Sequence, residues 1–258
     1  MGKRHQKKRL EAAVQAIQSK WGEQALQKGV RPTAARASVP CLPTGLTALD
    51  SILTIGGLPL GHISELIGQP TSGKRTLALH ILGHAQSRYP CVYIDLAQTF
   101  DPVYAAACHV NLARLAIAAP SSPGQALDLA CNLASGGKFG LIVFDSTAEL
   151  LTEAMPPDAA ATILRRLRHA LHDKPTALVF VTTPYFGEVD SPANYPPGFV
   201  LNQTAALRLS VRREKWRRDG ARIAGYTARV TVLRNRWGRT GQETTVRVTF
   251  NGVHVQGE

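Results

Sequence analysis

The stretch Gly68-Gln69-Pro70-Thr71-Ser72-Gly73-Lys74-Arg75 decides the fold that this sequence predicts. It follows an apolar run, 63–67, that is typical of a buried strand, and it precedes a helical run that begins at Thr76. A glycine-rich turn between a strand and a helix is the context of a phosphate-binding loop. The glycines let several backbone N–H groups point at one anion, while the helix start and the lysine add positive charge. We therefore predict that residues 68–76 bind nucleotide phosphates, the alternative being a chance match in an inert loop.

One position of this loop departs from the consensus. The residue after the lysine should be serine or threonine, because its hydroxyl binds Mg²⁺, but here it is Arg75. Thr76 does not simply replace it, since the next residue of a helix points about 100° away. An arginine at this position could itself neutralise phosphate, as a fixed cation in place of a mobile one. The sequence thus predicts the phosphate cradle without its usual metal ligand.

The composition bounds the class of protein. The chain has 258 residues, 44% hydrophobic and 19% charged, which is enough for one sizeable α/β domain or for one domain with a small appendage. The formal net charge of +12 indicates a polyanionic partner, nucleic acid before membrane, unless the surface is simply cationic throughout. No apolar run approaches the roughly 20 residues of a membrane span, and the four cysteines form no C-x-x-C pair. We expect a soluble, cytoplasmic protein with reduced thiols and no membrane partner.

Strands and helices alternate through the middle of the chain. The strands are almost continuously apolar, as in a parallel sheet that is covered on both faces. Beyond the first strand, the predicted strands are 91–95, 115–117, 141–145 and 177–181, and the predicted helices are 103–108, 125–134 and 159–172.

Both ends of the chain follow other patterns. Segments 205–211, 227–233 and 244–250 alternate like half-exposed strands of an antiparallel meander. At the other end, a basic tail precedes an amphipathic helix. The predicted fold class is α/β, with a mostly parallel sheet between helices, an antiparallel C-terminal meander and an N-terminal helix. We assign residues 1–42 to the tail, helix and linker, and 43–258 to one core whose C-terminal basic hairpins span 207–258.

The order of these pieces resembles the core of the bacterial RecA recombinase family. The resemblance rests on the phosphate loop together with Thr44-Gly45, Gly56-Gly57-Leu58-Pro59, Asp101-Pro102-Val103-Tyr104 and Val143-Phe144-Asp145-Ser146. It covers nearly the whole chain, although the small C-terminal domain of the family is not matched. It implies a RecA-like P-loop core that binds ATP.

The resemblance also implies roles for individual residues. Lys74 matches the phosphate lysine of the family, and Asp101 and Tyr104 match its adenine-contacting pair. Asp145 matches the acid that holds the metal through water. Arg234 and Arg236 fall where the family has two lysines that reach the nucleotide of the neighbouring subunit, which implies a homo-oligomer with a composite site.

Three departures from the family concern hydrolysis. The catalytic glutamate, which polarises the attacking water, falls at Ala97, and a methyl group cannot accept a proton. The glutamine that senses the terminal phosphate falls at Thr183, and the magnesium ligand falls at Arg75. We therefore predict that ATP binds with weakened Mg²⁺ binding and without efficient turnover.

The C-terminal hairpin region is rich in arginine. Between residues 208 and 239 the sequence has ten arginines and one lysine, opposed only by Glu214 and Asp219. Arginines with interleaved aromatic residues suit single-stranded DNA, because guanidinium groups bind phosphates and rings stack on bases. The alternative is a solvated hairpin whose tryptophan covers the edge of the sheet. The residues predicted to bind DNA are Arg212, Arg213, Lys215, Trp216, Arg217 and Arg218.

Two further segments bear on DNA binding. Segment 184–200 takes the place of the main DNA-binding loop of the family, but it carries acids and prolines and no basic residue. The second DNA loop is shortened, around 151–159. We expect DNA contact to shift toward the basic hairpin.

Three functions remain open: two of different class, and a working recombinase whose catalytic groups are relocated. The first is a RecA-like DNA repair or recombination protein that binds ATP and single-stranded DNA with little hydrolysis. The second is a non-enzymatic adaptor, similar to the ImuA type of RecA-derived factor, that would assemble with a recombinase or a translesion polymerase through protein contacts. Ala97 stands in place of the catalytic glutamate and Arg75 in place of the metal ligand, and both losses favour the adaptor. The retained Lys74, Asp101 and Tyr104, together with the two arginines Arg234 and Arg236, favour the first function.

Overall fold

The computed structural model describes residues 2–22, 39–151, 157–184, 195, 200–250 and 254–257. The chain forms two compact units, residues 1–38 and 39–258. In the first unit, helix α1 spans Gly2–Trp21. It includes the basic segment that the sequence suggested as a tail, so that segment continues the helix. Three of its apolar side chains, Leu10, Ile17 and Trp21, are exposed.

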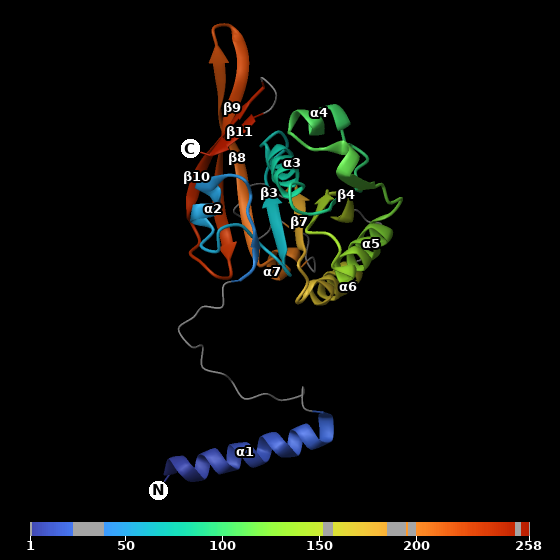
Figure 1. Ribbon diagram of the computed structural model, residues 1–258, viewed down its shortest axis with the longest axis vertical. Helices are drawn as coiled ribbons and strands as arrows, with labels where there is room; N and C mark the ends of the chain where they lie inside the picture. Colours follow the sequence, from blue (N-terminus) through green and yellow to red (C-terminus); the bar gives the residue numbers. More distant parts are fainter. Residues whose placement is uncertain are drawn as a thin grey trace. The chain divides into compact units, whose positions relative to one another are not determined.

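The second unit is built on a nine-stranded sheet (Figure 1). The strand order is β11-β10-β9-β8-β3-β7-β6-β4-β5, which is parallel from β8 to β5 and antiparallel from β8 to β11. The parallel strands are β3 (Ile63–Ile67), β4 (Cys91–Asp95), β5 (Leu115–Ala118), β6 (Leu141–Asp145) and β7 (Ala177–Thr182). The antiparallel part comprises β8 (Leu207–Asp219), β9 (Arg222–Asn235), β10 (Glu243–Thr249) and β11 (His254–Gly257).

Helices cover both faces of this sheet. One hydrophobic cluster joins the sheet to α2 (Thr47–Ile52), α3 (Lys74–Ala85) and α4 (Pro102–Ala107). The opposite cluster contains α5 (Pro123–Gly136), α6 (Pro157–Leu171) and α7 (Leu201–Thr204). Strands β3, β4, β6 and β7 are buried along their whole length, as their apolar sequences predict. The predicted α/β class with a mostly parallel sheet is confirmed.

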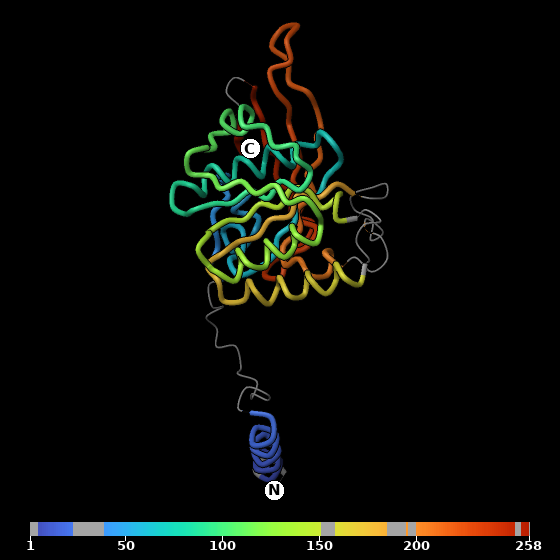
Figure 2. The backbone as a smooth tube through the Cα atoms, turned by 90° about the vertical axis from the view of Figure 1, so that its right-hand side faces the viewer, coloured from blue at the N-terminus to red at the C-terminus, as the bar shows by residue number. Residues whose placement is uncertain are grey.

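Several elements differ from their predicted bounds. The small sheet β1–β2 (Cys41–Leu42 and Leu58–Pro59), the short 3₁₀ helices 112–114 and 149–151, and strand β11 were not predicted. Strands β8 and β9 are about twice as long as expected, and their hairpin extends beyond the other strands (Figures 1 and 2). Most side chains of 212–223 are exposed, because this part of the hairpin has no core to cover. The alternation on which the strand prediction rested is therefore lost there.

A buried ion pair joins the parallel and antiparallel parts of the sheet. Glu65 on β3 has no solvent exposure, and its Oε2 accepts a hydrogen bond from Nε of Arg208 on β8 at 2.6 Å. Burial raises the pKa of Glu65, and the Arg208 guanidinium opposes this rise. Arg208 was counted with the basic hairpin, but its charge is paired with the buried carboxylate of Glu65.

Two further findings concern the cysteines and the helices. Cys41, Cys91, Cys108 and Cys131 are free thiols. Among the described residues, no helix combines the length and the apolar character that crossing a bilayer requires.

Candidate functional site

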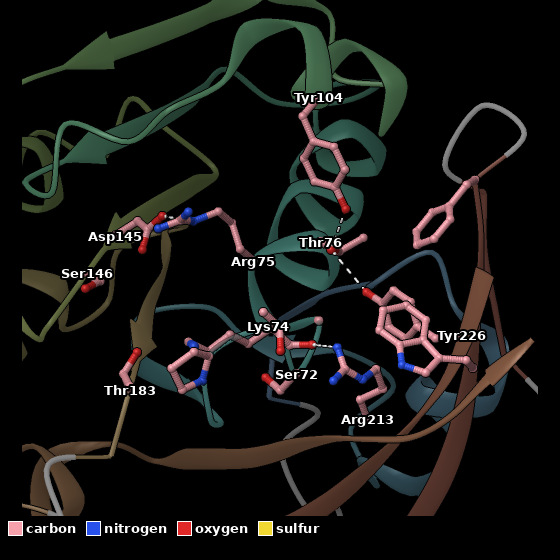
Figure 3. Close-up of a pocket in the computed structure, with 15 residues that line it drawn as sticks. Ser72, Lys74, Arg75, Thr76, Tyr104, Asp145, Ser146, Thr183, Arg213 and Tyr226 are labelled. Carbon is pink, nitrogen blue, oxygen red and sulfur yellow. Dashed lines mark hydrogen bonds and ion pairs between the residues drawn. The ribbon is translucent and has the colours of Figure 1, made fainter. Parts of the chain in front are cut away.

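The phosphate loop lies between the buried strand β3 and the start of helix α3. Gly73 precedes the helix with a left-handed φ of 98°, and a Cβ there would lie 2.6 Å from the hydroxyl oxygen of Tyr226. A Cβ at Gly68 would lie 2.4 Å from the carbonyl oxygen of Val211. Both positions therefore require glycine. The loop opens on a cavity of about 790 Å³ (Figure 3).

This cavity collects side chains from distant parts of the sequence. It is lined by the loop, by residues at or just after the ends of β6 and β7, by α4, and by the C-terminal strands. The lining residues beyond 70–76 are Tyr104, Asp145, Ser146, Thr183, Arg213, Trp216, Tyr226 and Phe250.

Lys74 is held inside the loop. Its side chain is buried, and its Nζ donates a hydrogen bond to the carbonyl oxygen of Gln69 at 3.2 Å. Burial lowers the pKa of Lys74 to about 8, with Asp145 raising it and Arg75 lowering it. The hydroxyl of Ser72 is also buried and has no hydrogen-bond partner among the described residues. A poorly hydrated cation and an unpaired hydroxyl in one loop are suited to an anion.

The pKa of Lys74 predicts a pH dependence. Phosphate binding needs the protonated amine, so ATP affinity should be constant near pH 7 and should fall above about pH 8, by at most roughly tenfold per pH unit. Calorimetric titrations between pH 7 and 9.5 measure this decline. Lys74→Arg should give a flat profile over the same range, because arginine stays protonated. A wild-type profile as flat as that of the variant would contradict the assignment.

Arg75 is directed away from the loop and toward Asp145 (Figure 3). Its Nε donates to Asp145 Oδ2 at 2.5 Å, and its Nη2 donates to the hydroxyl of Thr99 at 3.0 Å. The buried Tyr93 hydroxyl donates to the same carboxylate oxygen. The sequence suggested that Arg75 could neutralise phosphate, but its charge is already paired with a carboxylate that is 1% exposed.

The residues present do not fit a bound Mg²⁺. This ion needs a nearly octahedral set of oxygens, usually one or two carboxylates with water and phosphate. Asp145 Oδ2 is occupied by Arg75 and Tyr93, and Oδ1 is buried with no hydrogen-bond partner among the described residues. A single acceptor beside a fixed cation is a poor site for a dication. The water-mediated metal contact that the resemblance implied for Asp145 stays a prediction, and the pairing with Arg75 argues against it.

The hydroxyl of Thr76 contacts two tyrosines. Its Oγ1 lies 2.7 Å from Tyr104 Oη and 3.3 Å from Tyr226 Oη, so Thr76 does not take the place of the missing metal ligand. Burial raises the pKa of Tyr104 to about 12 and also raises the pKa of Tyr226. Both tyrosine hydroxyls therefore stay protonated at physiological pH and act as neutral hydrogen-bonding partners. Asp101 caps α4 by accepting hydrogen bonds from the N–H groups of Val103 and Tyr104. Tyr104 lines the cavity and Asp101 does not, so an adenine contact for the pair stays a prediction.

Of the other residues predicted to take part in nucleotide binding or hydrolysis, some line the cavity and others do not. Thr183 lines the cavity, whereas Ala97 is half-buried beyond the end of β4. Arg234 lies near the far end of β9, where its Nη1 donates to the carbonyl oxygens of Asn202 and Gln203. Neither Arg234 nor Arg236 lines the cavity of its own chain. Their proposed role in a neighbouring subunit stays a prediction.

The hairpin contributes two residues to the cavity that the sequence had assigned to DNA. Arg213 Nη1 donates to the carbonyl oxygen of Thr71 at 3.1 Å, and its guanidinium lies 4.2 Å from the centre of the Trp216 ring. Trp216 packs edge-on against Tyr226. The contact of Arg213 with Thr71 joins residues 142 positions apart, and nothing local in the sequence signals it.

The remaining basic side chains of the hairpin differ in their availability. Arg229 forms ion pairs at 2.6 Å with Glu214 and with Glu243. Glu243 lies on β10, outside the segment 208–239 over which the opposing acids were counted. The other predicted DNA residues, Arg212, Lys215, Arg217 and Arg218, are exposed or partly exposed along β8. Segment 184–200 lies outside the described residues except at 184, 195 and 200, and 152–156 of the shortened loop lie outside them as well.

Comparisons with known proteins agree with this architecture. Residues 8–254 match the model of the RecA N-terminal domain. The chain is 34% identical over 248 residues to Protein RecA of Chloroflexus aurantiacus, covering 89% of this chain and 70% of that protein. It is 33% identical over 263 residues to Protein RecA of Aquifex aeolicus, covering 95% and 75%.

A solved structure extends the comparison of the fold. The crystal structure of the RadB recombinase superposes with a TM-score of 0.63 at 22% identity, covering 83% of this chain and 98% of that one. At this identity the likeness concerns the fold alone. Together with the match to the RecA N-terminal domain over nearly the whole sequence, the phosphate loop and the sheet order establish that this chain belongs to the RecA family.

Proposed function

We propose that this member of the RecA family acts in DNA repair or recombination by binding ATP and single-stranded DNA with little or no hydrolysis. The observation that carries the proposal is the contrast between two neighbouring residues. Lys74 remains inside an open phosphate loop, whereas Arg75 is paired with Asp145 where a metal would be held. The anion site is kept while the metal site is closed.

The groups around the cavity support slow hydrolysis. A general base must accept a proton from the attacking water, and a carboxylate is the usual group in this role. Asp145 is the single carboxylate among the described lining residues, and it is already paired with Arg75. Ala97 offers no proton acceptor in its side chain. Loss of a base and of a metal each commonly lowers a rate by orders of magnitude.

The hairpin supports binding of single-stranded DNA. Its cations lie on one strand between residues 212 and 218, beyond the edge of the core, and Trp216 among them is 46% exposed. Cations along an extended strand suit a flexible phosphate backbone, and such binding is independent of sequence.

Two further proposals follow from the family: contact of Arg234 and Arg236 with a neighbouring subunit, and assembly into a homo-oligomer.

A nucleotide titration and an ATPase assay together test this function. A fluorescent ATP analogue should bind, its binding should be lost in Lys74→Ala, and turnover with single-stranded DNA should stay at the level of that variant. Robust turnover that depends on Lys74 would contradict the proposal.

The second candidate function is the non-enzymatic adaptor, which acts through protein contacts with a recombinase or a translesion polymerase. The closed Arg75–Asp145 pair favours it over a working ATPase. No binding of the nucleotide analogue, with or without DNA, would support the adaptor.

A further inference from the structure

Arg213 reaches the phosphate loop from the base of the hairpin. Its Nη1 donates to the carbonyl oxygen of Thr71 at 3.1 Å, and both residues line the same cavity as Lys74. Thr71 has a left-handed φ of 61° and lies in the middle of the loop. Figure 3 shows the Arg213 side chain beside Ser72 of the loop.

The guanidinium of Arg213 is held in place by aromatic packing. It lies over the ring of Trp216, which contacts Tyr226 with ring centres 5.8 Å apart. Tyr226 in turn donates a hydrogen bond to Thr76 in the first turn of α3. The pairing of β8 with β9 shifts register between Arg213 and Lys215, an irregularity of the kind that redirects side chains beside functional sites. A stacked guanidinium is preorganised, and its planar set of N–H groups matches a phosphate better than it matches one carbonyl oxygen.

The charges around the cavity indicate what Arg213 can do. Among the residues that the structure describes, the cations that line the cavity are Lys74, Arg75 and Arg213. Arg75 is paired with Asp145, whereas the described contacts of Arg213 are a carbonyl oxygen and an aromatic ring. A triphosphate without a divalent metal carries several negative charges, which a lysine alone leaves largely uncompensated.

We propose that Arg213 is a phosphate ligand in the site of its own chain and that it couples nucleotide binding to the DNA-binding hairpin. This inference rests on the proposed function and identifies the residue that joins its two parts. In the apo protein Arg213 bonds Thr71, and with nucleotide bound it donates to a terminal phosphate instead. The strand that carries it also carries Arg212, Lys215 and Arg217, so a change at Arg213 reaches the DNA contacts directly.

Nucleotides of decreasing charge test the phosphate contact. ATP, ADP and AMP are titrated at one ionic strength into wild-type protein, Arg213→Gln and Arg222→Gln. The Arg213→Gln variant should bind ATP roughly ten- to hundredfold more weakly, with a smaller loss for ADP and almost none for AMP. Arg213→Lys should recover part of the loss. The control Arg222 is an exposed arginine beside the hairpin turn, and its replacement should leave all three affinities unchanged.

The outcomes separate this inference from the proposed function. An equal loss for all three nucleotides would mean that Arg213 only holds the hairpin against the loop, and an unchanged ATP affinity would mean that it makes no contact. Either result overturns the inference while nucleotide binding stands. Wild-type protein that binds no nucleotide overturns both.

The coupling has its own readout. Single-stranded DNA should change the ATP affinity of wild-type protein, and by linkage ATP should change the DNA affinity by the same factor. In Arg213→Gln this factor should fall to one while DNA still binds. A factor that is unchanged in the variant would overturn the coupling.

Discussion

Reversing the charge of Arg212, Lys215, Arg217 and Arg218 to glutamate is expected to lower the affinity for single-stranded DNA by about three orders of magnitude at 0.1 M salt. Each phosphate contact on a single strand contributes about 0.7 to the slope of log affinity against log salt concentration, so four contacts account for roughly 10³-fold. These side chains lie along β8 where the hairpin leaves the core. Arg213 is left unchanged because it belongs to the nucleotide cavity. Fluorescence anisotropy with a labelled oligonucleotide over a salt series measures both the affinity and the slope.

A second variant with the same net charge serves as the control. Replacing the exposed residues Arg88, Lys138, Arg165 and Arg168 with glutamate changes the total charge equally but places the changes away from the hairpin. It should keep most of the affinity and nearly the whole salt slope. If both variants lose affinity to the same extent, binding depends on overall charge and the hairpin is not the DNA site.

Arg208→Ala is expected to destabilise the sheet strongly, lowering the free energy of unfolding by about 3–5 kcal/mol at pH 7. It leaves the carboxylate of Glu65 buried on β3 without its ion-pair partner. Urea denaturation followed by circular dichroism measures the loss. Arg229→Ala removes an arginine whose ion pairs lie at the surface, and its effect should be much smaller.

The pH dependence identifies Glu65 as the cause. Its pKa is raised in the folded protein by burial, and without Arg208 it should rise further. The folded state then takes up a proton more readily than the unfolded state, so stability falls as the pH rises above the unfolded value near 4.3. The deficit of Arg208→Ala relative to wild type should therefore shrink toward pH 4. A double replacement, Glu65→Leu with Arg208→Met, should recover most of the stability at pH 7. A deficit that is independent of pH would point to lost packing instead.

The buried half of the fold could be predicted from the sequence because burial leaves a local signal. Strands β6 and β7 are apolar at all but their last position, and β3 is apolar at three of its five positions. The bounds of all three agree with prediction to within one residue. The hairpin could not be bounded in this way. Beyond the core, β8 and β9 are held by backbone pairing and cross-strand contacts, so charged residues occupy both faces and no alternation marks the strands.

The candidate site was predictable only where one segment builds it. The phosphate loop is such a segment, and its glycines, its lysine and the missing hydroxyl at Arg75 are all visible in eight residues. The pairing of Arg75 with Asp145 depends on the direction of a long side chain, and it joins residues 70 positions apart. The contact of Arg213 with Thr71 depends on the register of β8 against β3 and on the register shift between β8 and β9. Pairwise geometry of this kind is set by the folded sheet and has no counterpart in local sequence.

The central claim is that the chain keeps an anion site while an internal arginine closes the metal site. Titration of ATP by calorimetry in Mg²⁺ and in EDTA tests it most directly, with Arg75→Thr as the comparison, because this change frees Asp145 and restores a hydroxyl after Lys74. Wild-type protein should bind ATP with nearly the same affinity in both buffers, and Arg75→Thr should bind more tightly in Mg²⁺ than in EDTA. Wild-type binding that appears only with Mg²⁺ would contradict the account.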